Sequence, residues 1–331
     1  MRSRIPLLCA VLAIPFACAA QSSDEIGLSL PQHNGRLSWS ATGFDTVESS
    51  AKPGGKEIGV RARNDSARLE YLGFLFLFPE QAPMTSARCS DGVLGPEKSA
   101  NKSMTVSGES DLDNGGSIPV HVVEYSTLKD SGGREYVVRG FVAAGDICGD
   151  FEFYADNPIH TADQKIHSVF ESLRFDKDYV PQFTDLFLYA QILYDGQQFA
   201  AAGPAFEAAL QKLDDAKGVD KKVMKRVLTD QAGMAYGISG NLAKSRAIFD
   251  SAITSDPDYP MYYYNLACAD AEEKNLTGAQ KHLQEAYDRR ANVIQGEKLP
   301  DPTQDDSFMP YRDNKAFWAF LVDLRTKLNR N

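Results

Sequence analysis

Hydrophobic and polar residues change their spacing once along this chain. In residues 25–178 apolar side chains tend to alternate with polar ones, most clearly in residues 56–63. There Ile58, Val60 and Ala62 fall on one face and charged residues on the other. Such alternation predicts β-strands that are buried on one face. In the rest of the chain apolar residues recur at helical spacing, so the sequence predicts a sheet followed by helices.

The N-terminal half is predicted to hold several further strands. Residues 37–40 alternate over a short stretch, and residues 68–78 contain a continuous apolar run that is typical of a central strand. Three further segments are rich in β-branched and aromatic residues: 120–125, 136–143 and 147–154. The segment 82–101 is expected to be irregular, apart from a short helix near residues 84–89.

A helix is expected to close this half. Thr161 with Gln164 three residues later fits a capping box. Four apolar residues follow at helical spacing: Ile166, Val169, Phe170 and Leu173. The predicted fold of residues 25–178 is therefore α+β, an antiparallel sheet with a helix laid on it. The strands and this closing helix resemble the small α/β sandwich of the PsbP and Mog1 families, whose members are mostly non-enzymatic partners in assembly.

The C-terminal half repeats itself at a spacing of 34 residues. The matched pairs are Gly233 and Ala267, Ser245 and Ala279, Ala252 and Ala286, Leu242 and Leu276, and Phe249 and Leu283. A fixed period of this length is typical of a solenoid, in which each unit buries its apolar face against its neighbours. The expected architecture of this half is an all-α array.

Placed on one template, these residues resemble the tetratricopeptide repeat. The resemblance implies three pairs of antiparallel helices at 183–216, 226–259 and 260–293, with nine extra residues in or near 214–225. It also implies that the small residues mark close helix contacts, where a larger side chain would overpack.

The end of the array needs a cover, because a solenoid leaves an apolar face exposed there. Residues 299–331 are predicted to supply it, as a connector followed by a capping helix that begins at Asn314.

The same resemblance implies a concave inner surface that binds partners. The residues expected on it are Phe187, Gln191, Tyr194, Met234, Met261, Tyr264 and Asn265. The Lys and Asn set that holds C-terminal carboxylates in chaperone-binding members is absent. Met and aromatic side chains adapt their packing to a partner, so the expected ligand is a protein or peptide of apolar or aromatic character. The alternative is that the chain itself covers these residues.

Residues 1–20 have the pattern of a secretory signal peptide, with Arg2 and Arg4 before an apolar core and small residues at its end. We therefore expect a periplasmic or extracellular protein. A lipid anchor at Cys18 is the alternative, although Pro15 stands where a lipoprotein signal usually has Leu. No stretch is apolar for long enough to predict a transmembrane helix.

The formal net charge is −10 and becomes −12 once the two positive charges of Arg2 and Arg4 are removed. This acidity argues against nucleic acid as a partner, because phosphates attract clustered cations. In an oxidising compartment a disulfide between Cys89 and Cys148 is expected to stabilise the fold by about 4 kcal/mol in the chain-entropy model. Two buried free thiols are the alternative. Cys268 is interpreted as a small packed hydrophobe.

No catalytic motif, cofactor-binding motif or metal-ligand spacing stands out, so we expect no cofactor and no metal site. The favoured hypothesis is an exported protein-interaction or scaffold protein whose repeats bind a partner. The alternative is an enzyme whose catalytic site lies in residues 25–178, with His121, Glu124, Asp146 and Asp150 as its best polar candidates.

Overall fold

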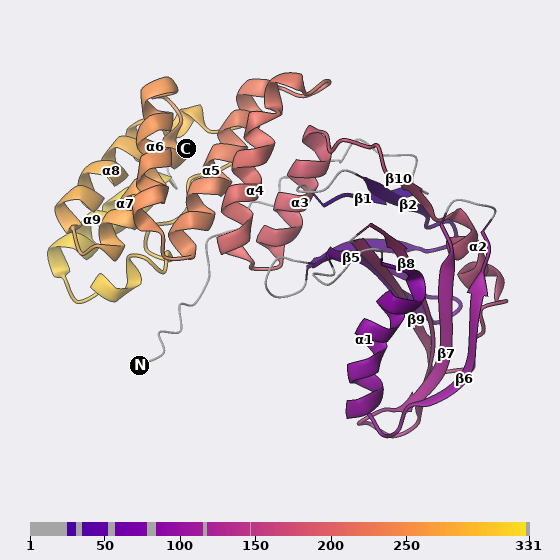
Figure 1. Cartoon of the computed structure of the whole chain (residues 1–331). Helices are drawn as coiled ribbons and strands as arrows, with labels where there is room; N and C mark the ends of the chain where they lie inside the picture. The colour runs from indigo at the N-terminus through magenta and orange to yellow at the C-terminus, as the bar shows by residue number, and fades with distance from the viewer. Residues whose placement is uncertain are drawn as a thin grey trace. The chain divides into compact units, whose positions relative to one another are not determined.

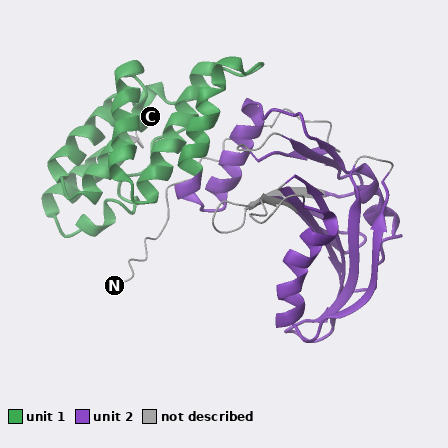
Figure 2. Ribbon diagram, in the orientation of Figure 1, with its two compact units in different colours: residues 1–17, 202–331 green, residues 18–201 purple. Residues whose placement is uncertain are grey.

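The computed structural model describes residues 25–30, 35–51, 57–77, 84–114, 118–145 and 147–328. The expected signal segment 1–20 with Cys18, and the candidate residue Asp146, lie outside this described part. Contacts divide the chain into two compact units, with the boundary between Ala201 and Ala202 (Figure 2). The N-terminal unit holds an antiparallel sheet and the C-terminal unit a run of helices (Figure 1). The predicted class, α+β followed by helical repeats, is confirmed.

The described residues of the N-terminal unit form a larger and a smaller antiparallel sheet. The larger has the strand order β3-β4-β5-β9-β8-β7-β6, formed by Thr46–Ala51, Glu57–Asn64, Leu69–Leu77, Ile147–Ala155, Arg134–Ala144, Val120–Leu128 and Thr105–Leu112. The smaller has the order β1-β2-β10, formed by Glu25–Leu28, Arg36–Ser40 and Arg174–Asp176. The unit also contains the helices α1 (Ser86–Ala100), α2 (Gln164–Ser172) and α3 (Phe183–Asp195).

Both faces of the larger sheet are covered. On one face Phe141 and Cys148 pack in a buried cluster with Leu94 of α1. On the other face the ring of Phe151 meets Trp39 of β2 edge-on, with centroids 5.0 Å apart, and Phe153 belongs to the same cluster as the apolar face of α2. The central strands therefore lie between α1 and a second layer built from α2 and the smaller sheet (Figure 1).

Helix α1 is longer than the short helix predicted near residues 84–89. It runs on to Ala100 although Pro96 lies inside it, a residue that costs a helix its regular hydrogen bonding. Thr85 caps its first turn by accepting a hydrogen bond from the Arg88 N–H. Leu94 is fully buried beneath it, so burial against the sheet outweighs the weak helix propensity of this segment.

Two further links hold α1 on the sheet. Cys89 of α1 and Cys148 of β9 form a disulfide, with their Cα atoms 5.9 Å apart. The Arg139 guanidinium donates to both carboxylate oxygens of Asp150, at 2.9 and 2.7 Å, and to Glu97 of α1 at 2.7 Å. Arg139 and Asp150 are almost fully buried, so each would be a costly unpaired charge without the other.

The predicted capping box of the closing helix is wrong. Helix α2 has Asp163 at its N-cap, and Thr161 lies before the helix. The backbone N–H and the hydroxyl of Thr161 both donate to Glu124 Oε1, at 2.8 and 2.6 Å. Thr161 therefore fixes the preceding loop to β7 instead of capping α2, because a nearby strand carboxylate competes for its donors. The expected apolar face of α2 is buried as predicted.

The remaining helices are α4 (Phe199–Gln211), α5 (Lys221–Ile238), α6 (Leu242–Ser255), α7 (Pro260–Glu272), α8 (Leu276–Asp288) and α9 (Lys315–Leu328), with the single 3-10 turns η1 (Leu213–Asp215), η2 (Arg290–Asn292) and η3 (Met309–Tyr311). The pairs α5–α6 and α7–α8 match the 34-residue spacing. The nine residues between the first two predicted repeats, 217–225, form most of the loop 216–220 and the first five residues of α5. None of the described helices is both long and apolar enough to cross a membrane.

Helix α3 belongs by its contacts to the N-terminal unit. It lies beside β3 and β4, and Ile192 is part of the core beneath the larger sheet. Asp185 near its start accepts a hydrogen bond from Tyr179 and lies 3.6 Å from Arg36 of β2. The division between the units therefore falls one helix later than the predicted domain end at residue 178.

The close approach inside the second repeat is made by Gly233. A Cβ built on Gly233 would lie 2.3 Å from the Phe249 ring, whereas one on Gly237 would lie 3.3 Å from the Ser245 hydroxyl. Gly233 therefore makes room for the Phe249 ring of α6. Ser245, which is also on α6, faces Gly237 and not Gly233.

We predict that Gly233→Ala destabilises the helical unit by about 1–2 kcal/mol. Overpacking against Phe249 costs about 1–3 kcal/mol, and the better helix propensity of alanine offsets up to about 1 kcal/mol of it. Gly237→Ala is the matched control on the same helix, since the Ser245 hydroxyl can rotate away. Urea unfolding followed by the helical circular dichroism measures both, and equal stability of the two variants contradicts the prediction.

Candidate functional site

Residues 294–311, called the connector from here on, cover the inner side of α7. They run beside α7 in the same direction, as three tyrosine hydrogen bonds show: Tyr259 to Glu297 at 2.8 Å, Tyr264 to Asp305 at 3.0 Å, and Tyr311 to the carbonyl of Ala271 at 2.5 Å. Phe308 is fully buried, with its ring edge-on to Tyr264. The connector therefore packs along the third repeat and covers part of α7.

Three of the residues expected on the partner-binding surface are buried in this arrangement. Tyr264 is 1% exposed, Met261 6% and Asn265 9%. The side-chain amide of Asn265 donates to Asp230 at 2.7 Å, which ties α7 to α5. Met234 is half-buried and packs against the same core cluster. The structure thus brings these four residues together, but a partner could reach Tyr264 only by displacing the connector.

The other three expected residues lie on α3, in the N-terminal unit. The ring of Phe187 stacks parallel to Phe183, with centroids 6.0 Å apart, and Tyr194 meets Phe199 edge-on at 5.1 Å. Tyr194 is buried, whereas Phe187 and Gln191 are half-buried. The tetratricopeptide template did not indicate that α3 would pack on a sheet.

Several carboxyl groups with raised pKa values lie in the connector and on the neighbouring helices α5 and α7. Burial raises the pKa of Asp230 well above its usual range, and the neighbouring charge of Glu297 adds to this, while the Asn265 hydrogen bond opposes it. Burial also raises the pKa of Glu297, of Asp305 and of Glu272. These groups are therefore accommodated more easily in their neutral form, because a charge held away from water is costly.

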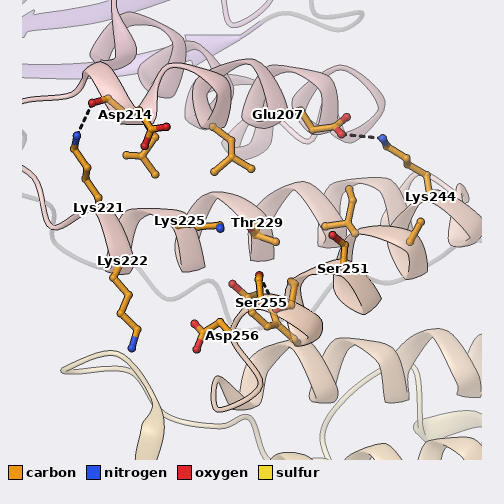
Figure 3. A pocket seen from close by; sticks show the side chains of 16 residues that line it. Glu207, Asp214, Lys221, Lys222, Lys225, Thr229, Lys244, Ser251, Ser255 and Asp256 are labelled. Atoms are coloured by element: carbon orange, nitrogen blue, oxygen red, sulfur yellow. Dashed lines mark hydrogen bonds and ion pairs between the residues drawn. The ribbon is translucent and has the colours of Figure 1, made fainter.

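An open cleft of about 820 Å³ lies elsewhere in the helical unit, between α4, η1, α5 and α6 (Figure 3). Its apolar lining consists of Leu210, Leu213, Ala247, Ile248, Ala252 and Tyr262, and its hydroxyl groups come from Thr229, Ser251 and Ser255. Its charged residues are Glu207, Asp214, Lys221, Lys222, Lys225, Lys244 and Asp256. The volume falls in the range of about 300–1,000 Å³ that is usual for ligand sites.

The charges of this cleft are unevenly paired. Lys244 lies 2.8 Å from Glu207, and Lys221 donates to the backbone carbonyl of Asp214. Asp256 accepts two hydrogen bonds from Arg226, at 2.6 and 2.9 Å. These bonds lower the pKa of Asp256, and the more distant charges of Lys222 and Lys225 lower it further. Lys222 and Lys225 therefore lie near a carboxylate that Arg226 already binds through both oxygens.

Sequence reasoning located the insertion, whose residues Lys221, Lys222 and Lys225 line the cleft, but it proposed no lining residue as a binding residue. The signal that could have indicated it is the basic run Lys221, Lys222, Lys225 and Arg226 at the start of α5. Positive charges at a helix start interact unfavourably with the helix dipole. Helix formation alone therefore does not account for this basic run.

The polar candidates for an enzyme site are held by separate partners. His121 Nδ1 lies 2.7 Å from Asp111, Glu124 binds His160 and Thr161, and Asp150 binds Arg139. His121 and Asp150 share a face of the sheet but are separated by the intervening Phe141 in register. Glu124 faces the opposite side. The cleft and a smaller pocket of about 290 Å³ near the β4–β5 turn contain none of the three.

Metal-ligating side chains do not gather either, within the part of the chain that the structure describes. No group of three or more His, Cys, Asp or Glu residues there is placed to hold a metal ion. Cys268 carries a free thiol, is half-buried, and lies 3.9 Å from Asp305.

Comparisons with known proteins assign no family. No protein-family model matches the chain, and no curated protein matches it. Among solved structures, PcrH from Pseudomonas aeruginosa aligns at 13% identity over 44% of this chain and 91% of its own, with a TM-score of 0.29. A protein from Bacteroides thetaiotaomicron aligns at 11% identity over 66% of this chain and 78% of its own, with a TM-score of 0.32.

A third match is the immunity protein TplEi of the P. aeruginosa type VI secretion system, in complex with a peptide. It aligns at 10% identity over 45% of this chain and 74% of its own, with a TM-score of 0.26. At TM-scores this low the three likenesses carry no conclusion about this chain.

We predict that the helical unit loses stability as the pH rises above about 4. A carboxyl whose pKa is raised by folding stabilises the fold fully below its unfolded pKa, and this contribution is lost as the pH rises through the folded value. Asp230, Glu297, Asp305 and Glu272 all have this sign. Thermal midpoints measured from about pH 5 to about pH 8 should therefore fall.

Asp230→Asn removes one of these carboxyl groups and keeps the shape of the side chain. The thermal midpoint of this variant should therefore depend less steeply on pH than that of the parent chain. A parent midpoint that rises over this interval, or an equal slope in the variant, contradicts the assignment.

Proposed function

We propose that this chain is an exported protein-interaction protein whose helical unit, built from tetratricopeptide-like repeats, binds a protein partner. The observation that carries the proposal is the open cleft between α4, η1, α5 and α6, in an array whose far end is closed by its own connector and α9. Stacked helical repeats form extended binding surfaces. This cleft combines apolar and polar lining in the manner of a recognition site.

Export is supported by the sequence pattern of residues 1–20. The disulfide between Cys89 and Cys148 is compatible with it, because disulfides persist in oxidising compartments such as the periplasm.

The inner surface remains a second part of the proposal. Within the helical unit, Met234 is half-buried and retains some exposed area. Tyr264 is buried and hydrogen-bonded to the connector. A charge placed at residue 264 would therefore disrupt folding and would not report on binding. Met234 is the better position for testing this surface.

The test is cross-linking of the full mature chain in an extract of its own cells, followed by mass spectrometry of the captured proteins. Three variants are compared: Lys225→Glu in the cleft, Met234→Glu on the inner surface, and Lys281→Glu as the control. Lys281 is an exposed lysine of α8 that does not line the cleft. Circular dichroism establishes that each variant is folded.

We expect one cross-linked protein that is lost with Lys225→Glu and kept with Lys281→Glu. Loss with Met234→Glu alone would move the binding site to the inner surface and retain the function. The absence of any protein whose capture depends on the helical unit would overturn the proposed function.

A further inference from the structure

We infer that the cleft between α4, η1, α5 and α6 takes a partner segment in which carboxylate side chains flank apolar ones. This inference rests on the proposed function and names the chemistry of the partner. It follows from three properties of the cleft, namely the room beside α6, the apolar lining and the uneven pairing of its charges.

The side of α6 that faces the cleft carries small side chains. Ala247, Ser251, Ala252 and Ser255 recur there at helical spacing, and Ala247, Ser251 and Ser255 are exposed. Small side chains let the backbone of another segment approach closely, as they do where helices pack inside the array. The open volume of about 820 Å³ beside them gives such a segment space to lie along α6 (Figure 3).

The apolar lining requires apolar side chains in the segment. Leu210 and Ile248 are half-buried and line the cleft from opposite sides, on α4 and α6. Covering their remaining apolar area would stabilise the complex by about 25 cal/mol per Å² removed from water. A small inorganic anion cannot supply this contact, whereas a leucine or phenylalanine of a partner can.

The charges require carboxylates beside those apolar groups. Lys222 and Lys225 are exposed, and within the described residues neither has a carboxylate at ion-pair distance. Asp256 is already bound through both oxygens by Arg226. A partner carboxylate can therefore pair with Lys222 or Lys225 without displacing an existing ion pair, and electrostatic complementarity of this kind favours the correct partner.

The same charges disfavour nucleic acid. Glu207 and Asp214 also line the cleft, and they would repel a continuous run of phosphates. Nucleic-acid sites instead neutralise many phosphates with clustered cations. An acidic and apolar protein segment satisfies both the cations and the apolar lining.

The test is selection from a phage-displayed library of random peptides on the full mature chain. The double variant Lys222→Glu with Lys225→Glu serves for counter-selection. We expect enriched peptides that carry Asp or Glu next to Leu, Ile or Phe. In fluorescence polarisation their amide analogues, with Asn and Gln for Asp and Glu, should bind about threefold to tenfold more weakly, which corresponds to a loss of about 0.65–1.4 kcal/mol.

A second variant separates shape from charge. Ser251→Trp fills the cleft from α6 without changing its charge, and Ser251 is exposed, so folding should be retained. Binding of the selected peptides should be lost in this variant and kept in Lys281→Glu. Added salt should weaken the binding of the acidic peptides more than that of their amide analogues.

Three outcomes would overturn the inference: selected peptides without acidic residues, undiminished binding to the Ser251→Trp chain, or complete displacement of the peptides by inorganic phosphate. Each leaves the proposed function standing as long as the cross-linked partner is still captured by the parent chain. Loss of that partner overturns the proposed function itself.

Discussion

Each layer of this protein presents apolar side chains on two sides, and the need to cover both sides organises both units. The larger sheet is buried by α1 on one face and by α2 with the smaller sheet on the other. In the helical unit the repeats cover one another, and the connector with α9 covers α7 and α8. Burial of this apolar area is the dominant favourable term in folding. The polar interactions therefore occur at positions where they do not interrupt the apolar contacts.

The sequence predicts best where structure depends on local spacing. The helix pairs α5–α6 and α7–α8 follow from residues 34 positions apart, and α9 follows from its apolar stripe after Asn314. Helix α1 does not, because Pro96 disfavours a helix there, and contacts distant in sequence, among them the disulfide, the Arg139 ion pair and the burial of Leu94, hold it in place. Strand β6 was missed because most of its residues are polar and exposed, and pairing with β7 alone defines it.

The candidate site was harder to predict than the fold. A repeat template places Tyr264 on an inner surface, but the atoms that cover it belong to Asp305 and Phe308, about forty residues later. No periodicity encodes such a contact. The cleft differs in that Lys221, Lys222 and Lys225, which line it, belong to the insertion between the first two predicted repeats. A repeat template describes what repeats share, so it does not describe residues that occur in one repeat alone.

The connector also determines where this array can change in length. Its hydrogen bonds reach Tyr259, the last residue of the second repeat, and Tyr264 and Ala271 of the third. Asn265 of the third repeat is bound in turn to Asp230 of α5. Residues 221–328 thus form one terminal block whose parts are matched to each other. An additional repeat inserted within the block would separate these partners, whereas the loop 216–220 already tolerates irregular spacing. Lengthening of the solenoid, by evolution or by design, is therefore expected at that loop, with the terminal block carried along unchanged.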